Sequence, residues 1–272
     1  MAIHGIWGSP FIDLERHVDV AGLAAIDAEI SYALTQVAVD YTGGSHKSMG
    51  IVPPSLMGEP YVDYGQVIAR FSREEFVTFV SLAEDPSAFD PDQRERYQWG
   101  EEREVPLTRR QMLYLKYRHG VYFPWKVFYE LIPGRYWSDK STGKGKQFTR
   151  EARVLFPRTI ELVRGLPFAE IGRCNIMGLE ANDHGTVHRD GEPAEGRAPD
   201  HFITLCPRGD KRLFLWDEER REKTPVSPRA YWFNDCDYHG VEADPFFRYS
   251  IRVDGVFREG FLAEIATARR DQ

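Results

Sequence analysis

The chain has 272 residues, of which 42% are hydrophobic and 13% aromatic, so it can build the core of one large domain. Its formal net charge of −7 at pH 7 gives no general attraction to nucleic acid or to an anionic membrane. The first residues lack the basic region and long apolar run expected of a secretory signal, and no stretch approaches the roughly 18 apolar residues of a membrane span. We therefore expect a cytoplasmic protein whose partner is a small molecule, not nucleic acid or a membrane.

The three cysteines, Cys174, Cys206 and Cys236, are far apart in the sequence and form no Cys-x-x-Cys pair. This spacing excludes a zinc knuckle and a thioredoxin-type motif. Their odd number and wide separation favour buried, reduced thiols, as in a cytosolic protein.

Helix signals dominate the first half of the chain. Apolar residues recur at helical spacing over residues 20–39, which predicts a helix there. Ser72 with Glu75, and Thr108 with Gln111, have the spacing of capping boxes. Each of these two pairs therefore predicts the start of a helix.

Loops and an aromatic-rich segment separate these helices. A Gly- and Pro-rich loop is expected over residues 42–60, and a polar surface loop over residues 85–104. Residues 121–129 are rich in aromatic side chains and favour a buried strand or a pocket wall, whereas residues 138–147 favour a flexible, basic loop. Thr149 should cap a last helix, which ends near residue 165.

Short strands separated by turns replace the helices from residue 171 onward. Pro207-Arg208-Gly209-Asp210 predicts a tight turn, so the strands on either side are expected to form a hairpin. Helices followed by short strands predict an α+β fold with a jelly-roll core. We expect residues 1–165 to be mostly helical and to build a lid and pocket wall, and residues 166–272 to form the jelly-roll catalytic core of one integrated domain. The expected strands cover residues 173–179, 186–189, 201–206, 212–216, 230–234 and 247–253.

One series of polar residues in the strand region has the pattern of a metal site. His188-Arg189-Asp190 lies between turn signals, and residues i and i+2 of a strand point to the same face. His239 follows a later strand, and an antiparallel arrangement would bring it beside the first pair. Two histidines and one carboxylate can hold one face of an Fe(II) ion and leave the other face open. We therefore predict metal ligands at His188, Asp190 and His239.

Two other histidines compete for this role. His17-Val18-Asp19 has the same His-x-Asp spacing, but it opens a helical region where Asp19 is better explained as an N-cap. His184 lies near His188 but has no carboxylate two residues later. We therefore assign neither of them as a metal ligand.

Polar residues alternate along the last predicted strand. Arg248, Ser250 and Arg252 share one face of it. Arg248 and Ser250 could hold the far carboxylate of a dicarboxylic acid through charge-assisted hydrogen bonds. Arg252 has two interpretations. The one we favour is a salt bridge with Asp254 or Asp235, and the other is a contact with an anionic group of the substrate.

Taken in order, His188-x-Asp190, His239 and Arg248-x-Ser250 resemble the Fe(II)/2-oxoglutarate-dependent oxygenase superfamily. The Arg-x-Ser spacing is most similar to the branch that includes isopenicillin N synthase and the plant oxygenases. The resemblance covers roughly the last 100 residues. It implies a double-stranded β-helix (jelly-roll) core in which the first three residues hold iron. It also implies that Arg248 and Ser250 bind the C5 carboxylate of 2-oxoglutarate.

The resemblance further implies Fe(II), 2-oxoglutarate and O2 as cofactors, with Asn175 as a candidate for the C1 end of 2-oxoglutarate. The expected activity is hydroxylation of an unactivated C–H bond of a small metabolite, such as an amino acid or a natural-product intermediate, with release of succinate and CO2. An α-carboxylate on such a substrate would suit Arg252. Desaturation or cyclisation would use the same chemistry. Halogenation is not expected, because Asp190 fills the ligand position that halogenases leave open.

Two other classes of protein fit part of the pattern. A cupin-type metal enzyme would use the same three ligands without 2-oxoglutarate and would not need Arg248 or Ser250. A non-catalytic jelly-roll binding module would contain the histidines for structural reasons only. A zinc hydrolase is disfavoured, because no general base is identifiable beside the predicted ligands.

Overall fold

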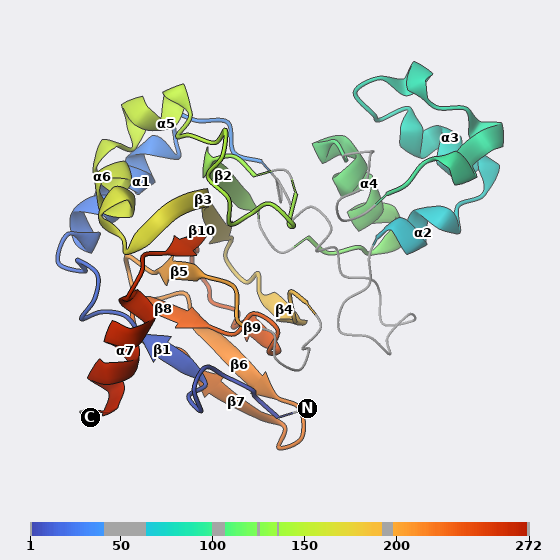
Figure 1. Cartoon of the computed structure of the whole chain (residues 1–272). Coiled ribbons are helices and arrows are strands. Elements are labelled where there is room, and N and C mark those ends of the chain that lie inside the picture. Colours follow the sequence, from blue (N-terminus) through green and yellow to red (C-terminus); the bar gives the residue numbers. More distant parts are fainter. Residues whose placement is uncertain are drawn as a thin grey trace.

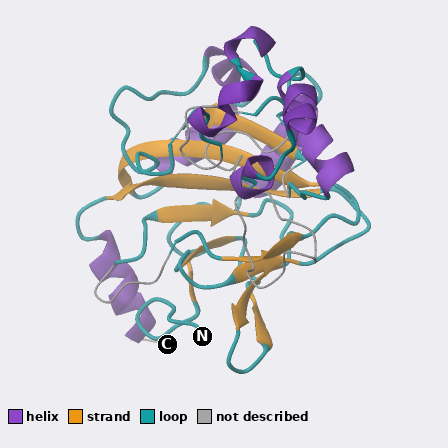
Figure 2. Cartoon of the chain, turned by 90° about the vertical axis from the view of Figure 1, so that its right-hand side faces the viewer, coloured by secondary structure: helices purple, strands orange, loops and turns teal. Residues whose placement is uncertain are grey.

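The computed structural model describes residues 2–40, 64–99, 107–123, 126–134, 136–191 and 198–270. The loop expected over residues 42–60 lies outside these ranges. The described chain forms two antiparallel sheets with helices packed around them (Figures 1 and 2), so the predicted α+β class is confirmed. Within the described ranges, no helix has the length and apolar character needed to cross a membrane.

The larger sheet contains, in spatial order, β1 (Phe11–Asp13), β8 (Ala230–Phe233), β5 (Phe202–Leu205), β10 (Arg248–Phe257), β3 (Phe168–Leu179) and β2 (Val127–Ile132). The smaller sheet contains β4 (Gly185–His188), β9 (His239–Val241), β6 (Leu213–Asp217) and β7 (Glu222–Pro225). From β3 to β10 the chain alternates between the two sheets, except that β6 and β7 are neighbours in one sheet. This alternation between two antiparallel sheets is the one expected of a jelly roll, and the jelly-roll core stays a prediction.

The predicted hairpin at residues 207–210 is wrong. β5 pairs with β8 and β10 in the larger sheet, whereas β6 pairs with β7 and β9 in the smaller one. The turn therefore carries the chain from one sheet to the other. A tight turn brings two strand ends together, but the two strands here pack face to face across the sandwich instead of side by side.

Three helices cover the outer face of the larger sheet: α1 (Leu23–Ala33), α5 (Arg150–Leu155) and α6 (Pro157–Gly165) (Figure 1). Tyr249 of β10 points toward them, and its hydroxyl donates to Oδ1 of Asp27 in α1 over 2.8 Å. Tyr129 of β2 stacks on Phe156, which precedes α6, with ring centroids 5.1 Å apart. The alternate residues of β10 therefore face the space between the two sheets.

Most of the predicted helix caps are confirmed. Ser72 and Thr108 each form a complete capping box, and the Thr149 side chain accepts the hydrogen bond that caps α5. The N-cap prediction for Asp19 is wrong. Its carboxylate accepts from the N–H of Ala21, before α1 begins, and α1 has no side-chain cap.

A second group of helices lies at the right of Figure 1 and has its own apolar core. It contains α2 (Gly65–Ala69), α3 (Arg73–Val80), the short 3-10 helices η3 (Pro86–Ala88) and η4 (Pro91–Arg96), and α4 (Arg109–His119). Phe76, Phe79 and Met112 are buried in this core. Gly120 ends α4 with a φ angle of 68°, a left-handed conformation that glycine adopts without strain.

Strands also come from the first part of the chain. β1 and β2 precede residue 165 and form the two edges of the larger sheet. At the other end of the chain, α7 (Phe261–Arg270), which was not predicted, buries Phe261 and Ile265 against the core. β3 begins close to the expected boundary at residue 166. The division into a helical region and a jelly-roll catalytic core stays a prediction.

Candidate metal centre

β4 and β9 bring the two predicted histidine ligands together. The strands pair antiparallel, and His188 at the end of β4 lies directly opposite His239 at the start of β9. Their ring centroids are 4.4 Å apart. Gly240 allows this close approach, because a Cβ atom there would lie 2.7 Å from the Phe214 ring and 2.9 Å from the carbonyl oxygen of Gly185. The expected adjacency of the two histidine strands is confirmed.

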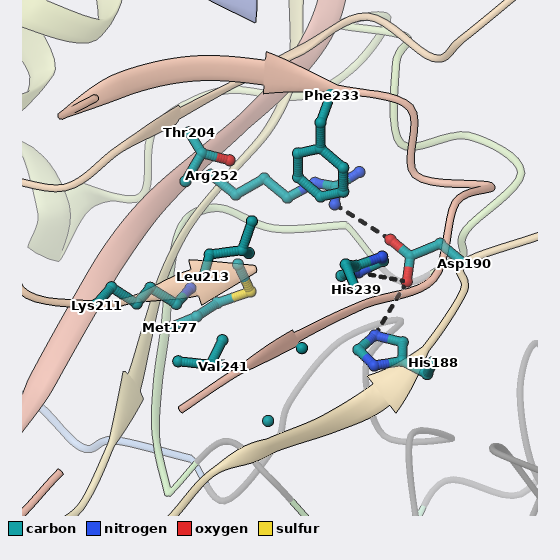
Figure 3. Close-up of a pocket in the computed structure, with 12 residues that line it drawn as sticks. Met177, His188, Asp190, Thr204, Lys211, Leu213, Phe233, His239, Val241 and Arg252 are labelled. Atoms are coloured by element: carbon teal, nitrogen blue, oxygen red, sulfur yellow. Dashed lines mark hydrogen bonds and ion pairs between the residues drawn. The ribbon is translucent and has the colours of Figure 1, made fainter. Parts of the chain in front are cut away.

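Backbone carbonyl groups fix the orientation of both imidazoles. Nδ1 of His188 lies 2.8 Å from the carbonyl oxygen of Thr186, and Nδ1 of His239 lies 2.9 Å from that of Asp237. A carbonyl oxygen can only accept, so each Nδ1 donates, and in a neutral ring this would leave the Nε2 lone pair available to a metal ion. Both Nε2 atoms face Oδ1 of Asp190, at 3.4 Å and 3.8 Å (Figure 3).

The three side chains, two buried histidines and a partly buried aspartate, form a compact set of possible metal ligands, with one ligand atom from each lying within 4.8 Å of the others. Burial and the neighbouring His188 lower the pKa of His239 to about 3, so its imidazole is neutral at pH 7. Burial alone would raise the pKa of Asp190, but His188, His239 and Arg252 hold it well below its usual range. A set of two imidazoles and one carboxylate suits Fe(II).

A pocket opens beside these ligands (Figure 3). Its lining residues come from both sheets, so it lies between them. Besides the three candidate ligands, its polar side chains are Thr204 of β5, Lys211 before β6 and Arg252 of β10. The pocket therefore combines a possible metal site with positively charged groups.

Lys211 was not singled out in the sequence, yet it lines this pocket. Its side chain is 3% exposed, and its Nζ donates to Oγ of Ser250. Burial lowers the pKa of the ammonium group to about 8, and an anion bound beside it would stabilise the charged form. No sequence signal marks Lys211, because a charged residue between a turn and a strand is usually exposed.

Arg248, predicted to bind the co-substrate, is fully buried at the start of β10 and does not line the pocket. Its guanidinium donates to the backbone carbonyl oxygens of Glu180, Asp183, Glu242 and Phe246. These hydrogen bonds tie the loop after β3 to the loop after β9. The placement does not support direct contact between Arg248 and a co-substrate. Ser250 lies two residues farther along β10 and meets the pocket through Lys211.

Arg252 forms the salt bridges that the sequence favoured. Its Nε lies 3.0 Å from Oδ1 of Asp254, and its Nη2 lies 3.0 Å from Oδ2 of Asp235. Its Nη1 lies 3.2 Å from Oδ2 of Asp190. The structural interpretation of Arg252 is confirmed. Its alternative role in binding substrate stays a prediction: Arg252 lines the pocket, but carboxylates engage all three guanidinium nitrogens.

Asn175, the candidate for the C1 end of 2-oxoglutarate, lies on β3 opposite Arg252 of β10. It is fully buried and does not line the pocket. In the amide orientation that satisfies both neighbours, it lies 3.2 Å from the Cys174 carbonyl oxygen and 3.2 Å from Nε of Arg173. Its proposed contact with a co-substrate stays a prediction that this placement does not support.

No protein-family model and no curated protein matches the chain. Among solved structures, a prolyl-4-hydroxylase from Pseudomonas putida is 11% identical with a TM-score of 0.26, and the match covers 40% of this chain and 66% of that one. A 2OG-Fe(II) oxygenase family oxidoreductase from Burkholderia pseudomallei is 13% identical with a TM-score of 0.30, covering 47% and 66%. A viral collagen prolyl hydroxylase from Paramecium bursaria Chlorella virus-1 is 8% identical with a TM-score of 0.26, covering 47% and 77%. The chain thus spans just under two thirds of the first two, and functional inference depends on the site itself.

The protein should bind one divalent ion per chain, and His239→Ala should weaken that binding at least about 100-fold, because one of three ligands is lost. Calorimetric titration with Mn(II) measures this. His17→Ala is the matched control, since His17 belongs to the other His-x-Asp pair and lies 3.5 Å from Glu264. Equal effects of the two substitutions would contradict the assignment.

Proposed function

We propose that this protein is an Fe(II)- and 2-oxoglutarate-dependent oxygenase. The observation that carries the proposal is one pocket that contains both a His-Asp-His ligand set and a buried lysine, Lys211. Figure 3 shows the lysine across the pocket from the ligand set. A metal ion and a cationic group placed in this way suit a co-substrate that chelates metal at one end and has a carboxylate at the other.

His188, Asp190 and His239 would hold the iron through two Nε2 atoms and one carboxylate oxygen. Bound Fe(II) supplies, with 2-oxoglutarate and O2, the oxidation of a substrate C–H bond and the release of succinate and CO2. The protein binds and orients the reactants and excludes water from them. The apolar side chains that line the pocket for this purpose are Met177, Leu213, Phe233 and Val241.

Lys211 takes the role that the sequence assigned to Arg248. Its ammonium group would bind the C5 carboxylate of 2-oxoglutarate through a charge-assisted hydrogen bond. The hydroxyl of Ser250 accepts from Lys211 and would hold its ammonium group in place for this contact. Thr204, also on the pocket wall, can donate as well. Ser250 would then act through Lys211, and its direct contact with 2-oxoglutarate stays a prediction.

We infer that the substrate is a small metabolite, such as an amino acid or a natural-product intermediate, and that hydroxylation is the outcome. The net charge of −7 offers no attraction to a nucleic acid substrate. Desaturation or cyclisation would use the same metal site. Halogenation is not expected, because Asp190 provides the third ligand.

The protein supplied with Fe(II), 2-oxoglutarate and O2 should release succinate, and omission of any one of the three should stop the release. Mass spectrometry of the products measures this, and a screen of free amino acids should identify compounds that raise the rate. A cupin-type enzyme would bind metal but release no succinate. A binding module would show neither property.

Lys211→Met should raise the KM for 2-oxoglutarate about 10- to 100-fold, since it removes a charge-assisted contact worth about 1.5–3 kcal/mol. Metal affinity should not change, and Lys211→Arg should recover part of the loss. Arg248→Met should lower the thermal midpoint instead, because it removes hydrogen bonds between two loops. If Arg248→Met raised the KM for 2-oxoglutarate and Lys211→Met did not, the C5 carboxylate would be assigned to Arg248, as the sequence predicted.

The affinity for 2-oxoglutarate should depend on pH through Lys211. Its pKa of about 8 in the free protein rises when an anion binds beside it, so binding favours the protonated form. The affinity for 2-oxoglutarate should therefore be highest below pH 8. It should fall as the pH rises above 8, by up to about tenfold per pH unit. Calorimetry with Mn(II)-loaded protein from pH 7 to 9 measures the change. Lys211→Arg stays charged over this range, so the same fall in that variant would argue against the mechanism.

A further inference from the structure

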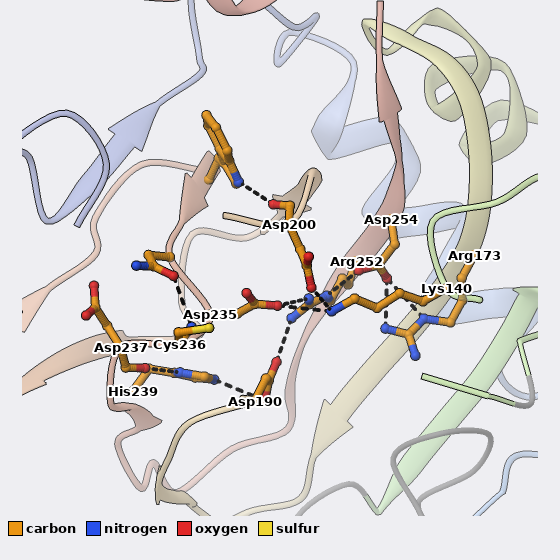
Figure 4. A network of polar contacts seen from close by, with 12 residues as sticks. Lys140, Arg173, Asp190, Asp200, Asp235, Cys236, Asp237, His239, Arg252 and Asp254 are labelled. Atoms are coloured by element: carbon orange, nitrogen blue, oxygen red, sulfur yellow. Dashed lines mark hydrogen bonds and ion pairs between the residues drawn. The ribbon is translucent and has the colours of Figure 1, made fainter. Parts of the chain in front are cut away.

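Asp190 is part of a buried network of ion pairs (Figure 4). We propose that Arg252 and Asp235 are a positioning pair that holds Asp190 as a one-oxygen metal ligand. The proposal rests on the metal centre described above, but not on the identity of the co-substrate. Neither Arg252 nor Asp235 belongs to the ligand set, so both act through Asp190.

The two oxygens of Asp190 have different neighbours. Oδ1 faces Nε2 of His188 at 3.4 Å and Nε2 of His239 at 3.8 Å. Oδ2 accepts a hydrogen bond from Nη1 of Arg252 at 3.2 Å. Rotation about the Cβ–Cγ bond of Asp190 would turn the plane of the carboxylate and break this contact. Arg252 therefore fixes the orientation of the carboxylate, so that one oxygen faces the histidines and the other is engaged by the guanidinium.

Asp235 supports both the backbone and the side chain of Asp190. Its carbonyl oxygen accepts the backbone N–H of Asp190 at 2.8 Å. Its side-chain Oδ2 accepts from Nη2 of Arg252 at 3.0 Å, and the residue is 2% exposed. Asp235 lies in the turn between β8 and β9, shortly before His239. Asp235 therefore links the segment that carries His188 and Asp190 to strand β9, which carries His239.

Asp254 fixes Arg252 from the other side. Its Oδ1 accepts from Nε of Arg252 at 3.0 Å, and its Oδ2 accepts from Nη2 of Arg173 at 2.8 Å. The planar guanidinium of Arg252 thus makes three separate contacts, one with each of three carboxylates. It cannot turn without breaking at least one of them. A lysine would keep the charge but could not reproduce this geometry.

Lys140 extends the network to the loop of residues 138–147. Its Nζ lies 3.1 Å from Oδ2 of Asp235 and 2.8 Å from Oδ2 of Asp200. This loop was expected to be flexible, but it packs against β3 so closely that a Cβ atom on Gly172 would lie 2.1 Å from the Lys140 carbonyl oxygen. Asp235 is therefore held in place by this firmly packed loop as well as by Arg252.

Arg252→Lys tests the proposal, with Arg173→Lys as the matched control. Both arginines are buried, both bind Asp254, and both substitutions keep the charge, but only Arg252 contacts Asp190. Asp235→Asn is a nearly isosteric second variant. Co(II) affinity and the visible spectrum of bound Co(II) would be measured for each protein, with native mass spectrometry to count metal per folded chain and thermal midpoints to record stability.

Arg252→Lys and Asp235→Asn should weaken Co(II) binding about 10- to 100-fold and alter the Co(II) spectrum, as loss of a group that orients a ligand does. Arg173→Lys should lower stability with less than about a threefold change in affinity, because Arg173 contacts Asp254 but not Asp190. Unchanged affinity in Asp235→Asn, or equal losses for both arginines, would overturn the positioning role. Failure of the unsubstituted protein to bind Co(II) would instead overturn the metal centre itself.

Discussion

The pairing of β4 with β9 is the constraint on which the rest of the site depends. It sets His188 directly opposite His239, and a register shift of one residue would turn one imidazole to the other face of the sheet. The carbonyl groups of Thr186 and Asp237 then orient both rings. Backbone geometry thus orients the two histidines, whereas Asp190 lies after the end of β4 and depends on side-chain contacts.

Burial explains how the basic residues near the site are used. A buried guanidinium is costly unless its donors are satisfied. Arg248 meets this condition in part: its Nη1 and Nη2 donate to backbone carbonyl oxygens of two loops, and its Nε lies 3.4 Å from the carboxylate of Asp244. Arg252 meets it with three carboxylates. Both arginines are thereby committed to the structure. Lys211 differs, because its ammonium lies on the pocket wall, where burial lowers its pKa to about 8 and a bound anion would stabilise the charged form.

Local patterns predict much of this structure, and tertiary contacts account for what they miss. The capping boxes at Ser72 and Thr108 and the pairing of the histidine strands follow from short-range spacing. Strand alternation also places Arg248 and Arg252 on one face correctly, but it does not say which loops or carboxylates each side chain meets. Lys211 lies outside any strand, so periodicity carries no information about it. Its place in the pocket depends on the turn that crosses between the sheets, which the sequence alone suggested was a hairpin.

The central claim is that His188, Asp190 and His239 hold Fe(II) in a pocket that also binds 2-oxoglutarate. An anaerobic titration of the Fe(II)-loaded protein with 2-oxoglutarate, followed by visible absorption, tests it most directly. We predict a weak charge-transfer band that grows to saturation with 2-oxoglutarate and is absent from His239→Ala. The absence of any band at saturating Fe(II) and 2-oxoglutarate would contradict the claim.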